Sequence, residues 1–230
     1  KNLIPDINLT PYSIWLATVV VSGISYLSYL LKRYVFHESG VLVSGIIGGL
    51  YSSTATISVL ARKSRKASEQ EANEYVAAML LAVSMMFLRF MILILIFSRE
   101  IFTSIYPYLL IMSVVAAVVA WFIHSRHRRS KDMADESEDE DSSNPLEFKV
   151  ALIFATLFVV FTVLTHYTLV YAGTGGLNLL SFVSGLSDIT PFILNLLQNT
   201  GSVAVLVVVA CSMQAIISNI LVNMFYALFF

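Results

Sequence analysis

Charged side chains are scarce in this sequence of 230 residues. Only 13% of the residues are charged, whereas 57% are hydrophobic. An ordinary soluble domain has about 25% charged residues. Because so few polar side chains cannot cover a water-facing surface, the composition excludes a soluble globular domain and indicates an integral membrane protein.

Cysteine is also nearly absent, and the single Cys211 excludes an intrachain disulfide. The net charge of −1 gives no electrostatic reason to expect nucleic acid as a partner. No group of histidine, cysteine and carboxylate side chains has the spacing of a zinc site, so we predict no metal and no other cofactor. The chain begins at Lys1 without the pattern of a signal peptide, and we expect none.

Long apolar runs dominate what is present. A helix needs about 20 mostly apolar residues to cross about 30 Å of hydrocarbon, and the alternation typical of barrel strands is absent. The sequence therefore predicts an all-α integral membrane protein with about seven transmembrane helices. The predicted spans are residues 12–31, 41–61, 75–97, 101–123, 150–172, 174–197 and 203–229.

Lysine and arginine are distributed unevenly between the two sides that these seven spans would define. Ten lie on the side of the N-terminus, and three, which are Lys32, Arg33 and Arg99, lie on the other side. Cytoplasmic loops carry the excess of basic residues. We therefore predict a multi-pass protein of the cell membrane with a cytoplasmic N-terminus and an external C-terminus.

Two segments between the spans have patterns of their own. Residues 124–146 join a basic cluster to a stretch with seven acidic residues in ten positions. This composition predicts a flexible charged cytoplasmic linker, and a regulatory or lipid-sensing segment is the alternative. Ser68 and Glu71 form a capping-box pattern, which predicts a helix start just before the third span.

A shift of 136 residues aligns two parts of the sequence without a gap. The segment 49–54 falls on 185–190, and both copies share the pattern G-L-x-[S/D]-x-T. We predict repeat one in residues 1–100, a connecting span in 101–123, the linker in 124–146 and repeat two in 147–230. With four spans between corresponding helices, we expect two parallel three-helix repeats.

The segment GIIGGLYSSTATISVLARKSR (46–66), with its GGLxSSTA motif, resembles the signature of an uncharacterised C-terminal membrane domain. That domain usually follows an MgtC/SapB-type membrane region in bacterial and archaeal proteins. Further matches are Leu88-Arg89, Asn144-Pro145, Gly185-Leu186-x-Asp188 and Ser218-Asn219. The resemblance implies a fold and a membrane location, but no activity. The family pattern has an acidic residue in place of Thr190 and a lysine in place of Asn223, so a second ion pair is missing here.

Two full charges, Arg89 and Asp188, lie deep within predicted spans. A lone charge at the bilayer centre costs roughly 2.5–3.5 kcal/mol, so we expect these two residues to form an intramembrane ion pair. The pair either joins the two repeats structurally or belongs to a gate or an ion-linked site.

Hydroxyl side chains cluster after Gly48 and Gly49 in the middle of the second span. In a continuous helix they would bond to the preceding turn, but beside two glycines they favour a broken helix that faces a polar cavity. Gly185 and Pro191 predict a matching break in the sixth span. The candidate substrate-binding residues are Ser52, Ser53, Thr54, Thr56, Asp188 and Thr190, with Asn219 and Asn223 as supporting polar side chains.

These features predict a membrane transporter or channel-like protein for an ion or a small polar solute, with its site between the broken spans two and six. The alternative is a non-transporting regulatory or scaffolding membrane subunit. Residue patterns of intramembrane proteases are absent, so we do not expect an enzyme. The expected partners are the lipid bilayer, the ion or solute, and either a second copy of the chain or an MgtC-like membrane region.

Overall fold

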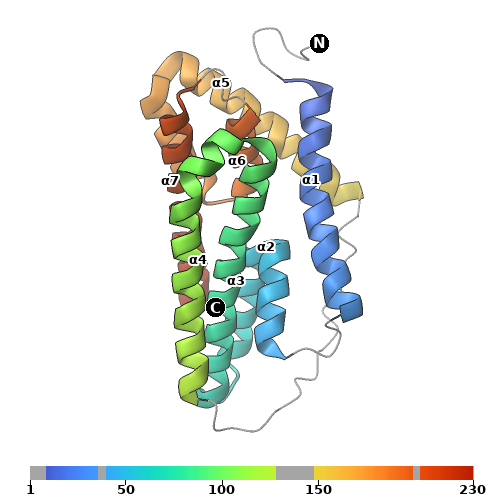
Figure 1. Cartoon of the computed structure of the whole chain (residues 1–230), viewed down its shortest axis with the longest axis vertical. Helices are drawn as coiled ribbons and strands as arrows, with labels where there is room; N and C mark the ends of the chain where they lie inside the picture. The colour runs from blue at the N-terminus through green and yellow to red at the C-terminus, as the bar shows by residue number, and fades with distance from the viewer. Residues whose placement is uncertain (1–8, 36–39, 128–147, 199–202, 230) are drawn as a thin grey trace. The chain divides into compact units, whose positions relative to one another are not determined.

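The computed structural model describes residues 9–35, 40–127, 148–198 and 203–229. Within these ranges the chain forms seven α-helices and one π-helical turn, with no β-strand (Figure 1). The all-α class is confirmed. The elements are α1 (Pro11–Leu30), η1 (Leu31–Val35), α2 (Val41–Ser64), α3 (Glu69–Phe97), α4 (Arg99–His127), α5 (Phe148–Ser184), α6 (Ile189–Gln198) and α7 (Val205–Phe229).

Six of the described helices are long and apolar enough to span a membrane, and α6, with 10 residues, is too short. Length and composition therefore indicate a multi-pass membrane protein, as the sequence predicts. The start of α3 also follows the sequence, because the backbone N–H and the hydroxyl of Ser68 both donate to the Glu71 carboxylate at 2.8 Å.

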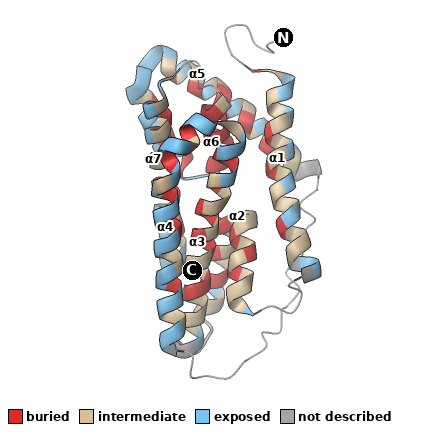
Figure 2. Cartoon of the chain, in the orientation of Figure 1, coloured by how far each residue is buried: buried red, intermediate tan, exposed pale blue. Residues whose placement is uncertain are grey.

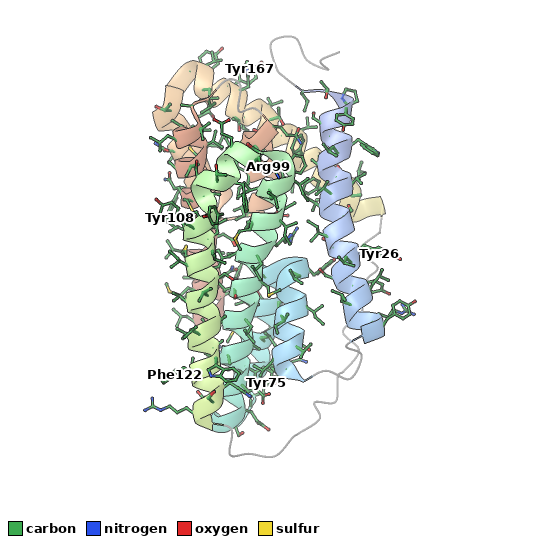
Figure 3. All side chains as sticks on the ribbon, in the orientation of Figure 1. Tyr26, Tyr75, Arg99, Tyr108, Phe122 and Tyr167 are labelled. Atoms are coloured by element: carbon green, nitrogen blue, oxygen red, sulfur yellow. The ribbon has the colours of Figure 1, made fainter. Side chains whose placement is uncertain are left out.

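The outer face of α4 is apolar along its length. Tyr108 and Phe122 project away from the helix (Figure 3), and they are 57% and 66% exposed. Their exposed neighbours on α4 are Leu110, Ile111, Val114, Val115, Val118, Val119 and Trp121. Soluble monomers rarely expose so large an apolar patch to water, so this face is suited to contact with the lipid bilayer.

Helix α2 folds back on itself at Ser52, whose backbone is extended (φ −156°, ψ 100°) within an otherwise helical run. In a straight helix, Gly48 and Thr56 would lie about 12 Å apart. Instead, a Cβ added to Gly48 would lie 2.8 Å from Thr56 Cγ2. Residues 41–51 and 53–64 therefore pack side by side (Figure 1), and we call this segment hairpin one (residues 41–64).

Helix α5 reverses at Gly173, which has a left-handed φ of 60° that glycine adopts without steric cost. A Cβ added to Gly176 would lie 2.8 Å from Thr168 Cγ2, eight residues earlier in the chain. Residues 148–172 and 174–184 are therefore two helical pieces that fold against each other. The first piece has the length of a membrane span, and the second has about half that length.

Helix α6 turns back toward the start of α7. The Asn219 amide on α7 donates to the Gly185 carbonyl at 3.3 Å, which places Gly185 about 20 Å along α7 from Val205. The chain from Gln198 to Val205 reaches at most about 25 Å. If α6 continued away from Val205, the gap would be about 34 Å. Residues 174–198 therefore form a second reversal, which we call hairpin two.

Hairpin two is packed tightly within the protein. Every residue of α6 from Ile189 to Leu197 is buried (Figure 2). Phe192 packs edge-on against Phe161, with 5.6 Å between the ring centroids, and Asn195 Nδ2 donates to Thr162 Oγ1 at 2.6 Å. A helix that is buried on all sides does not face lipid.

The predicted span over residues 174–197 is therefore not a single continuous helix. It consists of the last part of α5 and of α6, which are each about 15 Å long, with residues 185–188 between them. Together the two pieces have the length and apolar content of one span, which is why the sequence predicts one. The predicted span 41–61 is likewise divided, by the reversal at Ser52. The other predicted spans agree with helical segments to within one or two turns.

The chain separates into two compact units. Unit 1 comprises Lys1–Gly23, Ile92–Tyr106 and Leu146–Val222, and unit 2 comprises Ile24–Met91, Pro107–Pro145 and Asn223–Phe230. Hairpin two belongs to unit 1, and hairpin one belongs to unit 2. The predicted repeats in 1–100 and 147–230 are not tested by this division and stay a prediction. Most of the predicted linker, 124–146, lies outside the described residues.

Candidate functional site

The tip of hairpin one is the turn around the reversal at Ser52. Side chains bond to its backbone both before and after this residue. Breaking the helix at Ser52 frees the Tyr51 carbonyl from its bond along the helix, and Arg89 Nη1 on α3 donates to this oxygen at 2.8 Å. The Ser52 hydroxyl accepts from the Ala55 N–H at 3.4 Å, which is the position of an N-cap. Ser52 therefore both ends one half-helix and starts the next.

Hairpin one approaches α3 more closely than a side chain would allow. A Cβ added to Gly49 would lie 2.5 Å from both Cα and O of Ala82, and one added to Gly45 would lie 2.9 Å from Ala78 Cα. Glycine on α2 and alanine on α3 thus bring the two backbones together, as small residues do between membrane helices. This close packing fixes the depth of the tip along α3.

The tip of hairpin two comprises residues 185–188, between the end of α5 and the start of α6. The Asp188 carboxylate accepts from the Thr190 N–H at 3.0 Å and so caps α6. Asn219 Nδ2 donates to the Gly185 carbonyl at 3.3 Å and to the Ser187 carbonyl at 3.5 Å. The freed carbonyls of this tip are thus also satisfied by a side chain from the neighbouring long helix.

Hairpin two meets α7 through another close approach. A Cβ added to Gly185 would lie 2.5 Å from Ser218 Oγ and 2.8 Å from the Ala215 carbonyl oxygen. The Ser218 hydroxyl donates to the Phe182 carbonyl at 2.8 Å. Ser218 and Asn219 therefore occupy adjacent positions that hold the last turn of α5 and the tip after it.

The candidate substrate-binding residues divide between the two tips. Hairpin one carries Ser53, which is buried, and three half-buried residues, Ser52, Thr54 and Thr56. Hairpin two carries Asp188, which is exposed, and Thr190, which is buried. The expected pairing of Arg89 with Asp188 stays a prediction. The structure shows each of these charges bonded to the backbone of its own unit.

The residues expected to break the helices do not all lie at the breaks. Gly48 and Gly49 are helical, and the chain reverses after them, at Ser52. Gly185 begins the second tip, but Pro191 lies within the first turn of α6. A proline is tolerated in that turn because its missing N–H would have no helical partner. The glycines act through close packing, and the polar caps mark the reversals.

Each of the two tips offers polar groups of its own. The first presents hydroxyl groups and the positive charge of Arg89, and the second presents the negative charge of Asp188. Such groups can replace the hydration shell of an ion or of a small polar solute, and charges are felt more strongly in an apolar surrounding. No group of three or more histidine, cysteine or acidic side chains that could hold a metal occurs in the described part of the chain.

One polar pair was missed at the sequence level. Asn195 and Thr162 are both buried and hydrogen-bonded to each other, between α6 and the first part of α5. The signal was available, because Asn195 is the one polar side chain in the run 191–197. Asn223, a predicted supporting residue, is buried near the end of α7.

Replacing Asn219 by leucine should lower the free energy of unfolding by about 1–3 kcal/mol, because the carbonyls of the second tip lose their donor. Asn219→Asp should be at least as destabilising, since an ionised carboxylate cannot donate. The unfolding temperature of the detergent-purified protein measures both effects. Asn178→Asp is the matched control, because it keeps the oxygen that accepts from Cys211. Equal stability of Asn219→Leu and the parent protein would contradict this role.

Comparison with known families places both hairpins within one domain. Residues 19–230 match the family described as "Domain of unknown function (DUF4010)". The chain belongs to this family. The DUF4010 match spans α2 to α7, so the residues of both tips are part of the family domain. The match by itself shows neither a connection to MgtC/SapB-type regions nor that GGLxSSTA is a signature of the family, and both stay predictions.

A similar protein comes from Aquifex aeolicus (strain VF5) and is described as "Uncharacterized protein". It is 27% identical over 193 residues, which are 83% of this chain and 82% of that protein. The similarity therefore covers most of both chains. No solved structure matches.

Proposed function

We propose that this DUF4010 protein is a transporter or channel-like protein for an ion or a small polar solute, and that the polar groups at the two hairpin tips contact that solute. One observation carries the proposal. Two apolar segments of membrane-span length are each interrupted near the middle by capped, non-helical backbone. Interrupted helices with polar caps are the usual solute sites of transporters.

Interrupting a helix within the membrane has a cost in free energy. Non-helical backbone at membrane depth is tolerated only where it is buried in protein or lines a water-filled cavity, because lipid offers no hydrogen bonds. Asp188 adds an exposed carboxylate at the tip of hairpin two, and an ionisable group within a membrane segment is a functional hypothesis by default. Two continuous helices would pack together without this cost in free energy.

A transport role accounts for these features better than catalysis, because the sequence has no residue pattern of an intramembrane protease. We extend the proposal to the partners that the sequence suggests. These are a second copy of the chain or an MgtC-like membrane region, either of which would cover part of the apolar outer face.

The proposal predicts solute movement across proteoliposomes that contain the purified protein. Charge movement on solid-supported membranes tests concentration jumps of Na⁺, K⁺, Mg²⁺, H⁺, chloride and phosphate, and osmotic swelling tests glycerol and small sugars. We expect a response above that of empty liposomes for at least one probe. Silence for every probe, with folded and correctly inserted protein, would favour the non-transporting subunit.

Thr54→Val is the sharpest variant for this test. It removes one hydroxyl from the tip of hairpin one without a large change of shape, and a lost hydrogen bond of about 0.5–1.5 kcal/mol lowers apparent affinity about 2–10-fold. Val118→Ala on the lipid-facing side of α4 is the control and should leave the response unchanged. An equal response of Thr54→Val and the parent protein would remove this hydroxyl from the site.

A further inference from the structure

We propose that the chain crosses the membrane five times, that hairpins one and two are re-entrant, and that they open on opposite faces of the membrane with the N-terminus outside. A re-entrant segment enters and leaves the membrane on the same side. This topology goes beyond the proposed transport function and does not depend on it.

The geometry of hairpin one sets its two ends on the same side. Because residues 53–64 run back along 41–51, the contact of Gly48 with Thr56 is symmetric about the reversal at Ser52. Each half is about 16–18 Å long, which is close to half of the 30 Å hydrocarbon thickness. The segment therefore reaches the middle of the membrane and returns.

Hairpin two has the same design. Residues 174–184 extend about 16 Å from the turn at Gly173, and α6 returns by about 15 Å. The short reach of the chain from Gln198 to Val205 excludes an α6 that continues straight away from Val205. Both ends of hairpin two therefore lie on one side, next to the start of α7, and its tip lies at half depth.

Counting the crossings gives the topology. The crossing helices are α1, α3, α4, residues 148–172 of α5, and α7, while each hairpin contributes no crossing. Starting from the N-terminal side, the chain reaches the second side after α1, and hairpin one opens there. Three crossings later, after α3, α4 and the first part of α5, the chain is on the first side, where hairpin two opens.

The distribution of basic residues gives independent support. With five crossings, eleven of the lysines and arginines fall on the second side, and only Lys1 and Arg99 fall on the first. The seven-span count gives ten against three, because it separates Lys32 and Arg33 from the other basic loops. The five-crossing topology thus satisfies the positive-inside rule better. It makes the second side cytoplasmic and reverses the orientation that seven spans predict.

The two copies of the internal repeat also have equivalent packing contacts and caps. Gly49 meets Ala82, and Gly185 meets Ser218, so the packed pairs are separated by 33 residues in both cases. The caps Ser52 and Asp188 are 136 residues apart, and so are the first residues of α3 and α7, Glu69 and Val205.

An odd number of crossings separates corresponding helices in this topology. The repeats are then inverted, which is one of the two symmetries of transporters, whereas the seven-span count makes them parallel.

Single cysteines at both ends of α1 and of α7 test this topology in a Cys211→Ala background. The variants are Tyr12→Cys, Tyr34→Cys, Ala204→Cys and Phe229→Cys, all at exposed positions. Intact cells are treated with a membrane-impermeant thiol reagent. We expect labelling at residues 12 and 204, and protection of residues 34 and 229 until the cells are opened.

Two further positions serve as controls, because both topologies place them on the same side. Glu100→Cys should be labelled from outside, and Ala67→Cys should be protected. The reverse pattern at residues 12, 34, 204 and 229 would overturn the proposal in favour of seven crossings. Labelling at residue 12 together with protection of residue 204 would show that hairpin two crosses the membrane, and would overturn it as well. A silent transport assay would leave this result unaffected.

Discussion

Gly49→Leu should abolish most of the folded protein, which makes it the most damaging single change that we expect. Even a Cβ at this position would lie 2.5 Å from the backbone of Ala82, and backbone cannot move aside as a flexible side chain can. Overpacking of this kind typically costs about 1–3 kcal/mol and sometimes more, which is a large share of a total stability of about 5–15 kcal/mol. The yield of monodisperse protein after purification measures the effect.

Gly23→Leu is the matched control for this change. Gly23 also lies within a helix, but no atom lies within 4 Å of an added Cβ there. Because glycine is a poor helix former, the replacement should be neutral or stabilising by up to about 1 kcal/mol. If both leucine variants gave the same yield, close packing of hairpin one on α3 would not be the reason for the glycine.

Arg89→Leu should lower the free energy of unfolding by about 1.5–3 kcal/mol, the usual range for a hydrogen bond to a charged group. The Tyr51 carbonyl at the tip of hairpin one loses its donor, and an apolar surrounding offers no replacement. Arg89→Lys keeps the charge but not the shape of the guanidinium, and should fall between leucine and the parent protein. Unfolding temperature in detergent is the readout.

The exposed Arg99 at the start of α4 provides the control, since Arg99→Leu should change stability by less than about 0.5 kcal/mol. Combining Arg89→Leu with Asp188→Leu tests the predicted ion pair. If the two residues are partners, the double variant should be more stable than the sum of the single effects implies. Additive effects would leave Arg89 as a partner of Tyr51 and would remove the ion pair.

The composition and the hydroxyl cluster were enough to predict the membrane class, the all-α fold and interruptions within two segments. These properties depend on local chemistry, because lipid excludes polar surface and because freed backbone groups need nearby partners. The same reasoning located Ser52 and Asp188, whose side chains cap the second half of each hairpin. The exact residue of each reversal was beyond it: the structure has Ser52 three residues after Gly49, and Pro191 within the first turn of α6. Glycine and proline are also used for close packing and for first turns, so their positions alone do not mark a reversal.

Whether a segment crosses the membrane or returns within it depends on tertiary contacts. A span of 24 residues and a hairpin with two halves of the same total length have the same composition, the same hydropathy and the same polar centre. The difference is a single backbone reversal at Ser52, and a set of contacts between residues distant in sequence, such as Gly49 with Ala82 and Gly185 with Ser218. Which segments enter the membrane can be read from composition alone, because burial in lipid depends on side-chain chemistry. The direction in which they leave depends on packing against α3 and α7, which no local pattern records.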